Sequence, residues 1–481
     1  MNYGFKDKKI TMMGLGILGR GVNVAKFLAE NGAILTITDL KNAEQLESSL
    51  IKLKKFENIT YVLGEHRLED FRDKDIVIKS AGVPLDSVYI AEARKNNISV
   101  EMDASLFVRL AKESGKNITI IGITGTRGKS TTTHLLFEIL KNGFDIQKKS
   151  VVVSRFKKKG LGGIFESSRQ VFLGGNVKGL ATLPLLKKIK DGDIVVMELD
   201  SWQLQGFGDA KISPDIAVFT TFMPDHLNYY KGDMKMYFND KANIYRNQKE
   251  GDVLFMRPEV AEFIQDKDAD NIKSEIVVVD KKDVPEDWDV KLLGDNNRET
   301  VVLASAIAER LGVEQSVIKE AVENFGCLAG RLEFLREVNG VKYYNDTTAT
   351  TPDGVINALD SLSDYRGKIV LIGGGADKKL DYTEYAEKVK ENAKALILFM
   401  GEASEKILSV LNNKITRSSD GRVKESSIIS GITSMKDSFA KAQEFAEEGD
   451  IVLLSPGAAS FGVFKNEFDR GDQFCELVKN L

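Results

Sequence analysis

The residues best suited to chemistry lie in ITGTRGKST, residues 123–131, between an apolar run and a helical pattern. Glycines at a strand-to-helix turn expose backbone N–H groups that cradle phosphates, and the helix N-terminus adds partial positive charge. Lys129 would reach the terminal phosphates of a nucleotide, and Ser130 would bind Mg²⁺. The strict P-loop pattern G-x-x-x-x-G-K-[ST] is not met, because Ile123 stands at its first glycine. A glycine turn with an unrelated lysine is the alternative.

A second glycine-rich turn, GLGILGRG, occupies residues 14–21. Gly14, Gly16 and Gly19 complete G-x-G-x-x-G, and Asp39 closes the next apolar run 20 residues after Gly19. By local rules this is a dinucleotide fingerprint, in which glycines let the backbone approach a pyrophosphate and the acid receives a ribose. The motif alone favours a nicotinamide-dependent dehydrogenase, and the rest of the chain has to decide.

Strands and helices must hold both glycine turns in place, and the sequence shows them as short apolar runs that alternate with helical patterns. The strands expected are residues 8–16, 33–39, 58–64, 75–84 and 98–103, then 118–125, 193–200, 215–222, 251–256 and 275–280, and finally 368–374, 394–401 and 450–457. This rhythm is typical of parallel α/β sheets. We predict an α/β protein of three domains, each on a largely parallel sheet: Rossmann-like over 1–112, a P-loop-type ATPase over 113–328, and Rossmann-like over 329–481.

The segment 146–171 stands apart from this pattern as a basic insertion. We expect a β-hairpin-like excursion with six clustered cations: Lys148, Lys149, Arg155, Lys157, Lys158 and Lys159. A solvated surface ribbon is the simpler interpretation, and a phosphate- or partner-binding patch is the alternative.

Composition excludes several classes of protein. The 481 residues carry 67 basic and 71 acidic side chains, a net charge of −4, which argues against a nucleic-acid partner. Two cysteines cannot form a disulfide framework, and three histidines cannot form a His-rich metal cluster. Since no run has the length of a signal peptide or membrane span, we expect a cytoplasmic protein without a membrane partner. We also expect a monomer.

The variant loop T-G-T-x-G-K-S-T resembles the ATP loop of the Mur ligases, the ATP-dependent amide ligases of peptidoglycan precursor synthesis. Further segments similar to this family follow in order: FLGGN (172–176), MELDSWQL (197–204), FTTFMPDHLNYY (219–230), YFNDKANIYRNQ (237–248), GDNNRET (294–300), AGRLE (329–333), YYNDTTATTP (343–352) and LLSPGAASFGVFKNEFDRG (453–471). The first glycine turn and the closing FKNEFDRG most resemble the D-glutamate-adding branch.

The resemblance implies a ligase that adds D-glutamate to UDP-N-acetylmuramoyl-L-alanine through an acyl phosphate. It also implies ATP, two Mg²⁺ ions and a carbamylated Lys241 as cofactors. The first domain would then hold the uridine nucleotide of the substrate, because amides aimed at a diphosphate serve either ligand.

Individual roles follow from the same resemblance. The catalytic residues would be Lys129, Glu198, His226 and Lys241, and the metal ligands Ser130, Glu198, His226 and Lys241. ATP would meet Gly125, Thr126, Arg127, Gly128, Lys129, Ser130, Thr131, Asn297, Arg331 and Asp346. The UDP substrate would meet Gly14, Leu15, Gly16, Asp39, Leu40, Ser80, Gly82 and Asn176. The incoming glutamate would meet Thr350, Lys378, Ser460 and Phe468.

The sequence departs from the family pattern at several positions. Asn296 replaces a histidine, Thr300 an asparagine and Thr348 a lysine, while Glu467 displaces a phenylalanine and Asp200 stands where a serine is common. The altered glutamate pocket leaves open L-glutamate or another amino acid as substrate, as in other Mur or folylpolyglutamate-type ligases. A non-catalytic nucleotide-binding protein is the rival from a different class.

Overall fold

The computed structural model describes residues 3–17, 19–84, 86–157, 169–177, 179–227, 229–415 and 425–481. Its three sheets fall into two compact units. The first unit comprises Met1–Met223, Lys235–Glu286 and Glu299–Val322, and the second comprises Pro224–Met234, Asp287–Arg298 and Glu323–Leu481. None of the described helices is long and apolar enough to cross a bilayer.

The first sheet has the strand order β3-β2-β1-β4-β5, and all its pairs are parallel. The strands are β1 (Lys9–Met13), β2 (Ile34–Asp39), β3 (Ile59–Leu63), β4 (Ile76–Lys79) and β5 (Ser99–Glu101), with helices α1 (Arg20–Glu30), α2 (Glu47–Ile51) and α3 (Val88–Lys95). The turn between β1 and α1 carries the first glycine motif. It therefore opens at the carboxyl edge of a parallel sheet, where open α/β folds bind ligands.

The second sheet, also parallel, has the order β11-β10-β9-β6-β8-β7. Its strands are β6 (Thr119–Thr124), β7 (Val171–Gly175), β8 (Ile194–Glu198), β9 (Ile216–Phe219), β10 (Val253–Met256) and β11 (Glu275–Val278). The helices around it include α4 (Asp103–Glu113), α6 (Ser201–Asp209), α7 (Met234–Ala242), α8 (Pro258–Lys267), α9 (Asp295–Arg310) and α10 (Gln315–Asn324). Because β6, β8 and β9 are neighbours, the loops that follow them open side by side.

The third sheet has the order β12-β13-β17-β14-β15-β16 and is parallel except for its first pair. The strands are β12 (Glu333–Val338), β13 (Val341–Asn345), β14 (Ile369–Gly374), β15 (Ala393–Phe399), β16 (Ile428–Ile432) and β17 (Ile451–Leu454). Helices α11 (Pro352–Ser361), α12 (Thr383–Asn392), α13 (Glu402–Ile415), α14 (Met435–Phe445) and α15 (Glu467–Lys479) pack around it. Three largely parallel sheets confirm the predicted fold class.

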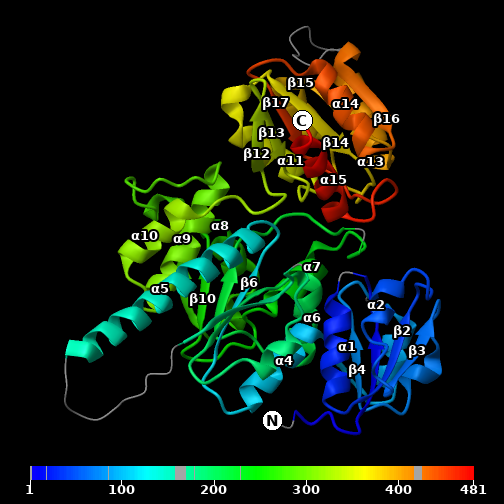
Figure 1. The fold of residues 1–481 in the computed structure, drawn as a ribbon, viewed down its shortest axis with the longest axis vertical. Coiled ribbons are helices and arrows are strands. Elements are labelled where there is room, and N and C mark those ends of the chain that lie inside the picture. The colour runs from blue at the N-terminus through cyan, green and yellow to red at the C-terminus, as the bar shows by residue number, and fades with distance from the viewer. Residues whose placement is uncertain are drawn as a thin grey trace. The chain divides into compact units, whose positions relative to one another are not determined.

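The prediction of a hairpin in the basic insertion is wrong for residues 146–157. These residues continue α5 (Lys129–Lys157), which begins at the ATP loop and runs for 29 residues (Figure 1). Between Asp145 and Lys159 the sequence contains neither glycine nor proline, so nothing interrupts the helical hydrogen bonds. The positions 158–168, including Lys158 and Lys159, lie outside the described residues.

Candidate functional site

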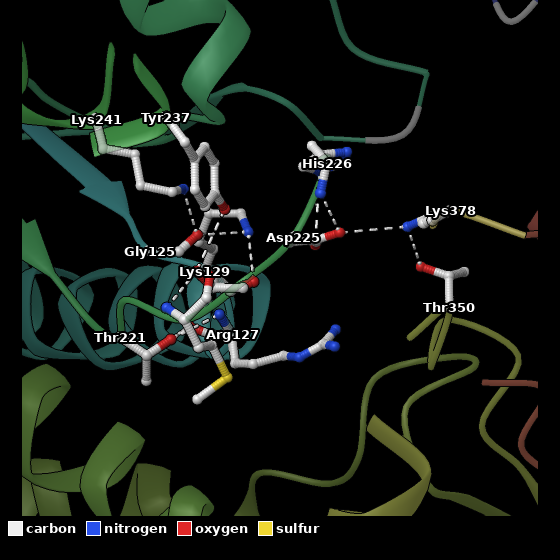
Figure 2. Close-up of polar contacts among 12 residues, drawn as sticks. Gly125, Arg127, Lys129, Thr221, Asp225, His226, Tyr237, Lys241, Thr350 and Lys378 are labelled. Atoms are coloured by element: carbon white, nitrogen blue, oxygen red, sulfur yellow. Dashed lines mark hydrogen bonds and ion pairs between the residues drawn. The ribbon is translucent and has the colours of Figure 1, made fainter. Parts of the chain in front are cut away.

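The ATP loop leaves β6 at Gly125, whose backbone has a φ of 147°. A Cβ there would stand 2.0 Å from the Thr220 Oγ1, so only glycine fits the turn. Lys129, the first residue of α5, folds back and donates from its Nζ to the carbonyl oxygens of Gly125 (2.9 Å) and Thr126 (3.1 Å) (Figure 2). Its ammonium therefore lies over the loop that the sequence assigns to phosphates.

Lys241 reaches the same carbonyl from α7. Its side chain is only 1% exposed, and its Nζ donates to the Gly125 oxygen at 2.8 Å (Figure 2). The Tyr237 ring lies 4.8 Å from this Nζ and offers its π face. Lysine side chains from α5 and α7 thus both donate to one carbonyl oxygen. Two positive charges this close together suit an anionic ligand, or a chemical modification that removes the charge of one amine.

Two threonines at the end of β9 hold the loop in shape. The Thr221 hydroxyl accepts from the Arg127 backbone N–H at 2.7 Å, and the Thr220 hydroxyl donates to the Arg127 carbonyl. The Nε and Nη2 of Arg127 are buried without a hydrogen-bond partner among the described residues. Sequence reasoning did not assign Thr220, Thr221 or Tyr237, although the pair of threonines directly after a buried strand was a usable signal.

Glu198 ends β8 beside this loop. Its strand pairs with β6 so that Glu198 lies opposite Ile123, and its side chain is 5% exposed. Ser130 follows Lys129 on α5 and is also buried. A carboxylate and a hydroxyl are hard oxygen donors that fit Mg²⁺. Among the residues that the structure describes, no group of three His, Cys, Asp or Glu side chains is placed to hold a metal.

The turn after β1 is organised by Asp39. One carboxylate oxygen accepts from the amides of Leu15 (2.9 Å) and Gly16 (3.0 Å), and the other accepts from the Lys41 amide (2.9 Å). The amides expected to meet a diphosphate are therefore engaged by Asp39, which buries its charge against them. A Cβ on Gly14 would stand 2.5 Å from the hydroxyl of Ser80, so these two predicted residues lie in contact.

The other three residues predicted to contact the UDP substrate are Leu40, Gly82 and Asn176, all in the first unit. Leu40 is 68% exposed directly after β2, and Gly82 lies exposed after β4. Asn176 follows β7, where its side-chain oxygen accepts from Arg20 at 3.1 Å. Arg20 was not predicted, because it follows Gly19, the last residue of the glycine motif, and the motif specifies no residue there.

In the second unit, Lys378 and Thr350, both predicted for the glutamate pocket, lie in contact. The Lys378 Nζ donates to the Thr350 hydroxyl at 3.0 Å and lies 3.6 Å from an oxygen of Asp225 (Figure 2). Asp225 also accepts from the backbone N–H of His226 at 2.7 Å, and His226 has a φ of 53°. The aspartate thus connects the lysine with the histidine expected to bind metal.

The remaining predicted residues lie on loops of the third sheet or on α9. Both oxygens of Asp346 are engaged, by the Leu332 amide at 3.0 Å and the Ser455 hydroxyl at 2.7 Å. Asn297 lies on α9, where its Nδ2 donates to the Leu293 carbonyl. Arg331 precedes β12, the buried Ser460 follows a bridge between Ala376 and Ala459, and Phe468 lies in the first turn of α15.

Arg470 is a further residue that sequence reasoning did not assign. Its buried guanidinium donates to the Thr347 hydroxyl (3.1 Å), the Thr347 carbonyl (2.8 Å) and the Ala458 carbonyl (3.3 Å). Burial lowers the pKa of Arg470 to about 10, which leaves it charged at neutral pH. The arginine therefore ties the loop after β13 to the loop after β17, which carry Thr350 and Ser460.

Three family models match successive parts of the chain: "Mur ligase MurD-like, N-terminal domain" over residues 8–101, "Mur ligase middle domain" over 123–318, and "Mur ligase, glutamate ligase domain" over 330–457. The chain belongs to the Mur ligase family. Its glycine-rich fingerprint at residues 14–19 therefore sits in a ligase N-terminal domain and not in a dehydrogenase.

Relatives of this Mur ligase extend over its whole length. It is 34% identical to a UDP-N-acetylmuramoylalanine–D-glutamate ligase of Roseiflexus sp. (strain RS-1), over 98% of this chain and 99% of that protein. It is 32% identical to the ligase of the same name from Borreliella burgdorferi (strain ZS7), over 99% of this chain and 98% of that protein.

Solved structures support the fold. UDP-N-acetylmuramate-alanine ligase MurC from Thermotoga maritima matches with a TM-score of 0.58 and 19% identity, over 98% of this chain and 99% of that one. MurF ligase from Thermotoga maritima, solved with ADP, matches with a TM-score of 0.57 and 16% identity, over 100% and 96%. At these identities the likeness concerns architecture.

Proposed function

We propose that this Mur ligase joins D-glutamate to the L-alanine carboxylate of UDP-N-acetylmuramoyl-L-alanine, at the expense of ATP, in peptidoglycan precursor synthesis. The observation that carries the proposal is full-length identity of 32–34% to relatives that bear this one name. The reaction makes the enzyme an ATP-dependent acid–amino-acid ligase acting on small molecules, and we place it in the cytoplasm as a monomer.

A carboxylate does not condense with an amine in water, so it first needs a leaving group. The γ-phosphoryl of ATP passes to the alanine carboxylate, which gives an acyl phosphate and ADP. The glutamate amine then attacks the carbonyl carbon and loses a proton, and phosphate leaves as the amide bond forms. Several anionic groups meet in such a transition state, so catalysis rests on positioning and charge neutralisation. The ammonium of Lys129 above the Gly125 carbonyl is a donor suited to the phosphates. So are the two Arg127 nitrogens that have no hydrogen-bond partner in the described part of the chain.

Ser130 and Glu198 would hold Mg²⁺ by their oxygens, with His226 and a modified Lys241 completing the set. Bound Mg²⁺ would neutralise charge on the phosphoryl group. A free Lys241 ammonium repels a divalent cation, whereas its carbamate presents two hard oxygens and a negative charge. The buried position of Lys241, with its Nζ on the Gly125 carbonyl that Lys129 also contacts, supports this modification because it places the amine at the ATP loop.

We assign the UDP moiety to residues 1–112, ATP to the central domain of 113–328, and glutamate to the domain of 329–481. The contact of Gly14 with Ser80 at the carboxyl edge of the first sheet supports the first assignment, because open parallel sheets bind ligands at that edge. The contact of Lys378 with Thr350 supports the third, because a cation beside a hydroxyl suits a carboxylate. Asn297, Arg331 and Asp346 would complete the ATP site, and Ser460 and Phe468 the glutamate pocket.

A panel assay of phosphate release tests the proposal. Purified enzyme with ATP and Mg²⁺ should release phosphate only when UDP-N-acetylmuramoyl-L-alanine and D-glutamate are both present. Omission of either substrate should return the rate to background. A preference for L-glutamate or another amino acid would overturn the assignment to D-glutamate. Nucleotide binding without any phosphate release would instead favour a non-catalytic nucleotide-binding protein.

Replacement of Lys378 by alanine should raise the KM for D-glutamate about 10–100-fold, because a hydrogen bond between charged groups contributes about 1.5–3 kcal/mol. The KM for ATP should change less than about twofold, and Lys378→Arg should retain part of the affinity. Exposed Lys379 is the matched control, and Lys379→Asn respects its φ of 59°. Parallel rises in both KM values, or none, would remove Lys378 from the glutamate pocket.

A further inference from the structure

Arg20 connects the first sheet with the second. It is the first residue of α1, directly after Gly19, and its guanidinium extends to the loop that follows β7. The Nη2 donates to the carbonyl of Gly175 (3.1 Å), the side-chain oxygen of Asn176 (3.1 Å) and the carbonyl of Val177 (3.4 Å), and the Nε donates to the carbonyl of Leu180 (3.1 Å). One arginine from the UDP-binding turn therefore donates to four oxygens in the ATP-binding domain, one at the last residue of β7 and three in the loop that follows.

The backbone of this loop has other supports. The Gly175 amide donates to the Thr182 hydroxyl at 2.9 Å, and the carboxylate of Asp103 accepts from the amides of Thr182 and Leu183, each at 2.8 Å. The Asn176 amide donates to the carbonyl of Glu198 at 2.6 Å. These hydrogen bonds fix the backbone of the loop without Arg20. The orientation of the Asn176 side chain is therefore what depends on Arg20.

An asparagine side chain can accept through its oxygen or donate through its NH₂ group. Arg20 is a permanent cation, so it fixes the oxygen of Asn176 on its own side and leaves the NH₂ group for a ligand. We propose that Arg20 is a positioning residue which makes Asn176 a hydrogen-bond donor to an oxygen of the UDP-linked substrate. This inference rests on the proposed function, and the ligand chemistry it requires is a phosphate or sugar oxygen beyond the uridine.

A substrate that spans both sheets should depend on Arg20, whereas UDP alone should not. Titration calorimetry with UDP and with UDP-N-acetylmuramoyl-L-alanine separates the two cases. Arg20→Met should weaken binding of the full substrate about 10–50-fold and leave the affinity for UDP within about twofold, and the KM for ATP should not change. Arg20→Lys keeps the charge but lacks the planar fork, so it should show the same pattern at smaller amplitude.

A double-mutant cycle identifies the partner. Asn176→Ala should weaken binding of the full substrate to a similar degree, and adding Arg20→Met to it should cost little more, because both changes remove the same interaction. Lys26→Ala, an exposed change on the same helix, is the control and should bind both ligands normally.

Equal losses for UDP and the full substrate in Arg20→Met would overturn the proposal, as would additive losses in the cycle. A wild-type enzyme that does not bind UDP-N-acetylmuramoyl-L-alanine at all would instead contradict the proposed function.

Discussion

The Lys241→Ala enzyme should lose about 10³-fold in turnover, and millimolar formate or acetate should restore part of the loss. The lysine lies buried on α7 with its Nζ 2.8 Å from the Gly125 carbonyl of the ATP loop. The Lys241 ammonium would lose one proton, and the neutral amine would then add to the carbon of CO₂ and release a second proton, so that a −1 group replaces a +1 group. A small carboxylic acid that enters the vacated volume supplies the same charge and oxygens. The expected loss corresponds to about 4 kcal/mol of activation free energy.

Carbon-13 NMR checks the modification itself. Wild-type enzyme equilibrated with ¹³CO₂ should show a carbamate resonance that is absent from Lys241→Ala. Lys235→Ala, an exposed change on the same helix, is the control and should keep both the resonance and the activity. A fully active Lys241→Ala enzyme would rule out a role for the carbamate.

Lys129→Ala should lower turnover by a similar factor of about 10³, but for a different reason and without rescue by carboxylic acids. The ammonium of Lys129 folds over the loop onto the carbonyls of Gly125 and Thr126, and we assign it to the terminal phosphates of ATP. Its removal leaves charge on the transferred phosphoryl group unneutralised, a loss of about 4 kcal/mol.

Binding measurements separate this variant from a misfolded one. Lys129→Ala should bind the UDP-linked substrate normally while its affinity for ATP falls. Lys141→Ala, at an exposed position farther along α5, should behave as wild type. Unchanged kinetics in Lys129→Ala would show that the loop does not bind ATP through this lysine.

The fold was largely readable from the sequence because its strands are buried on both faces. Runs such as DIVVMELD and KIVLIGG contain few polar interruptions, and β8 and β14 appear where they were expected. The antiparallel β12 was missed because EFLREV alternates apolar and charged residues at an edge, a weaker signal than a continuous run. The extended α5 was missed because a cluster of β-branched valines favoured a strand, while the helix already begun at Lys129 had no residue to end it.

The site was readable where a motif fixes local geometry. Lys129 opens a helix after a glycine turn, and such a position is set within a few residues of chain. Contacts between distant segments were not readable. The meeting of Lys241 with Gly125, and of Arg20 with Asn176, depends on how α7 and α1 pack, which no local pattern encodes. Asp200 is an intermediate case. Its carboxylate caps the N-terminus of α6 by accepting a hydrogen bond from the Gln203 amide. A serine hydroxyl makes the same kind of cap, which explains why aspartate can stand in place of the usual serine.

Transfer of an oxygen isotope tests the central claim most directly. The acceptor UDP-N-acetylmuramoyl-L-alanine is prepared with ¹⁸O in its alanine carboxylate and incubated with enzyme, ATP, Mg²⁺ and D-glutamate. If an acyl phosphate forms and the glutamate amine displaces phosphate, each inorganic phosphate should carry one ¹⁸O, and the product amide should retain the other. Phosphate without ¹⁸O, released at the same rate as the amide forms, would contradict the acyl-phosphate ligase mechanism.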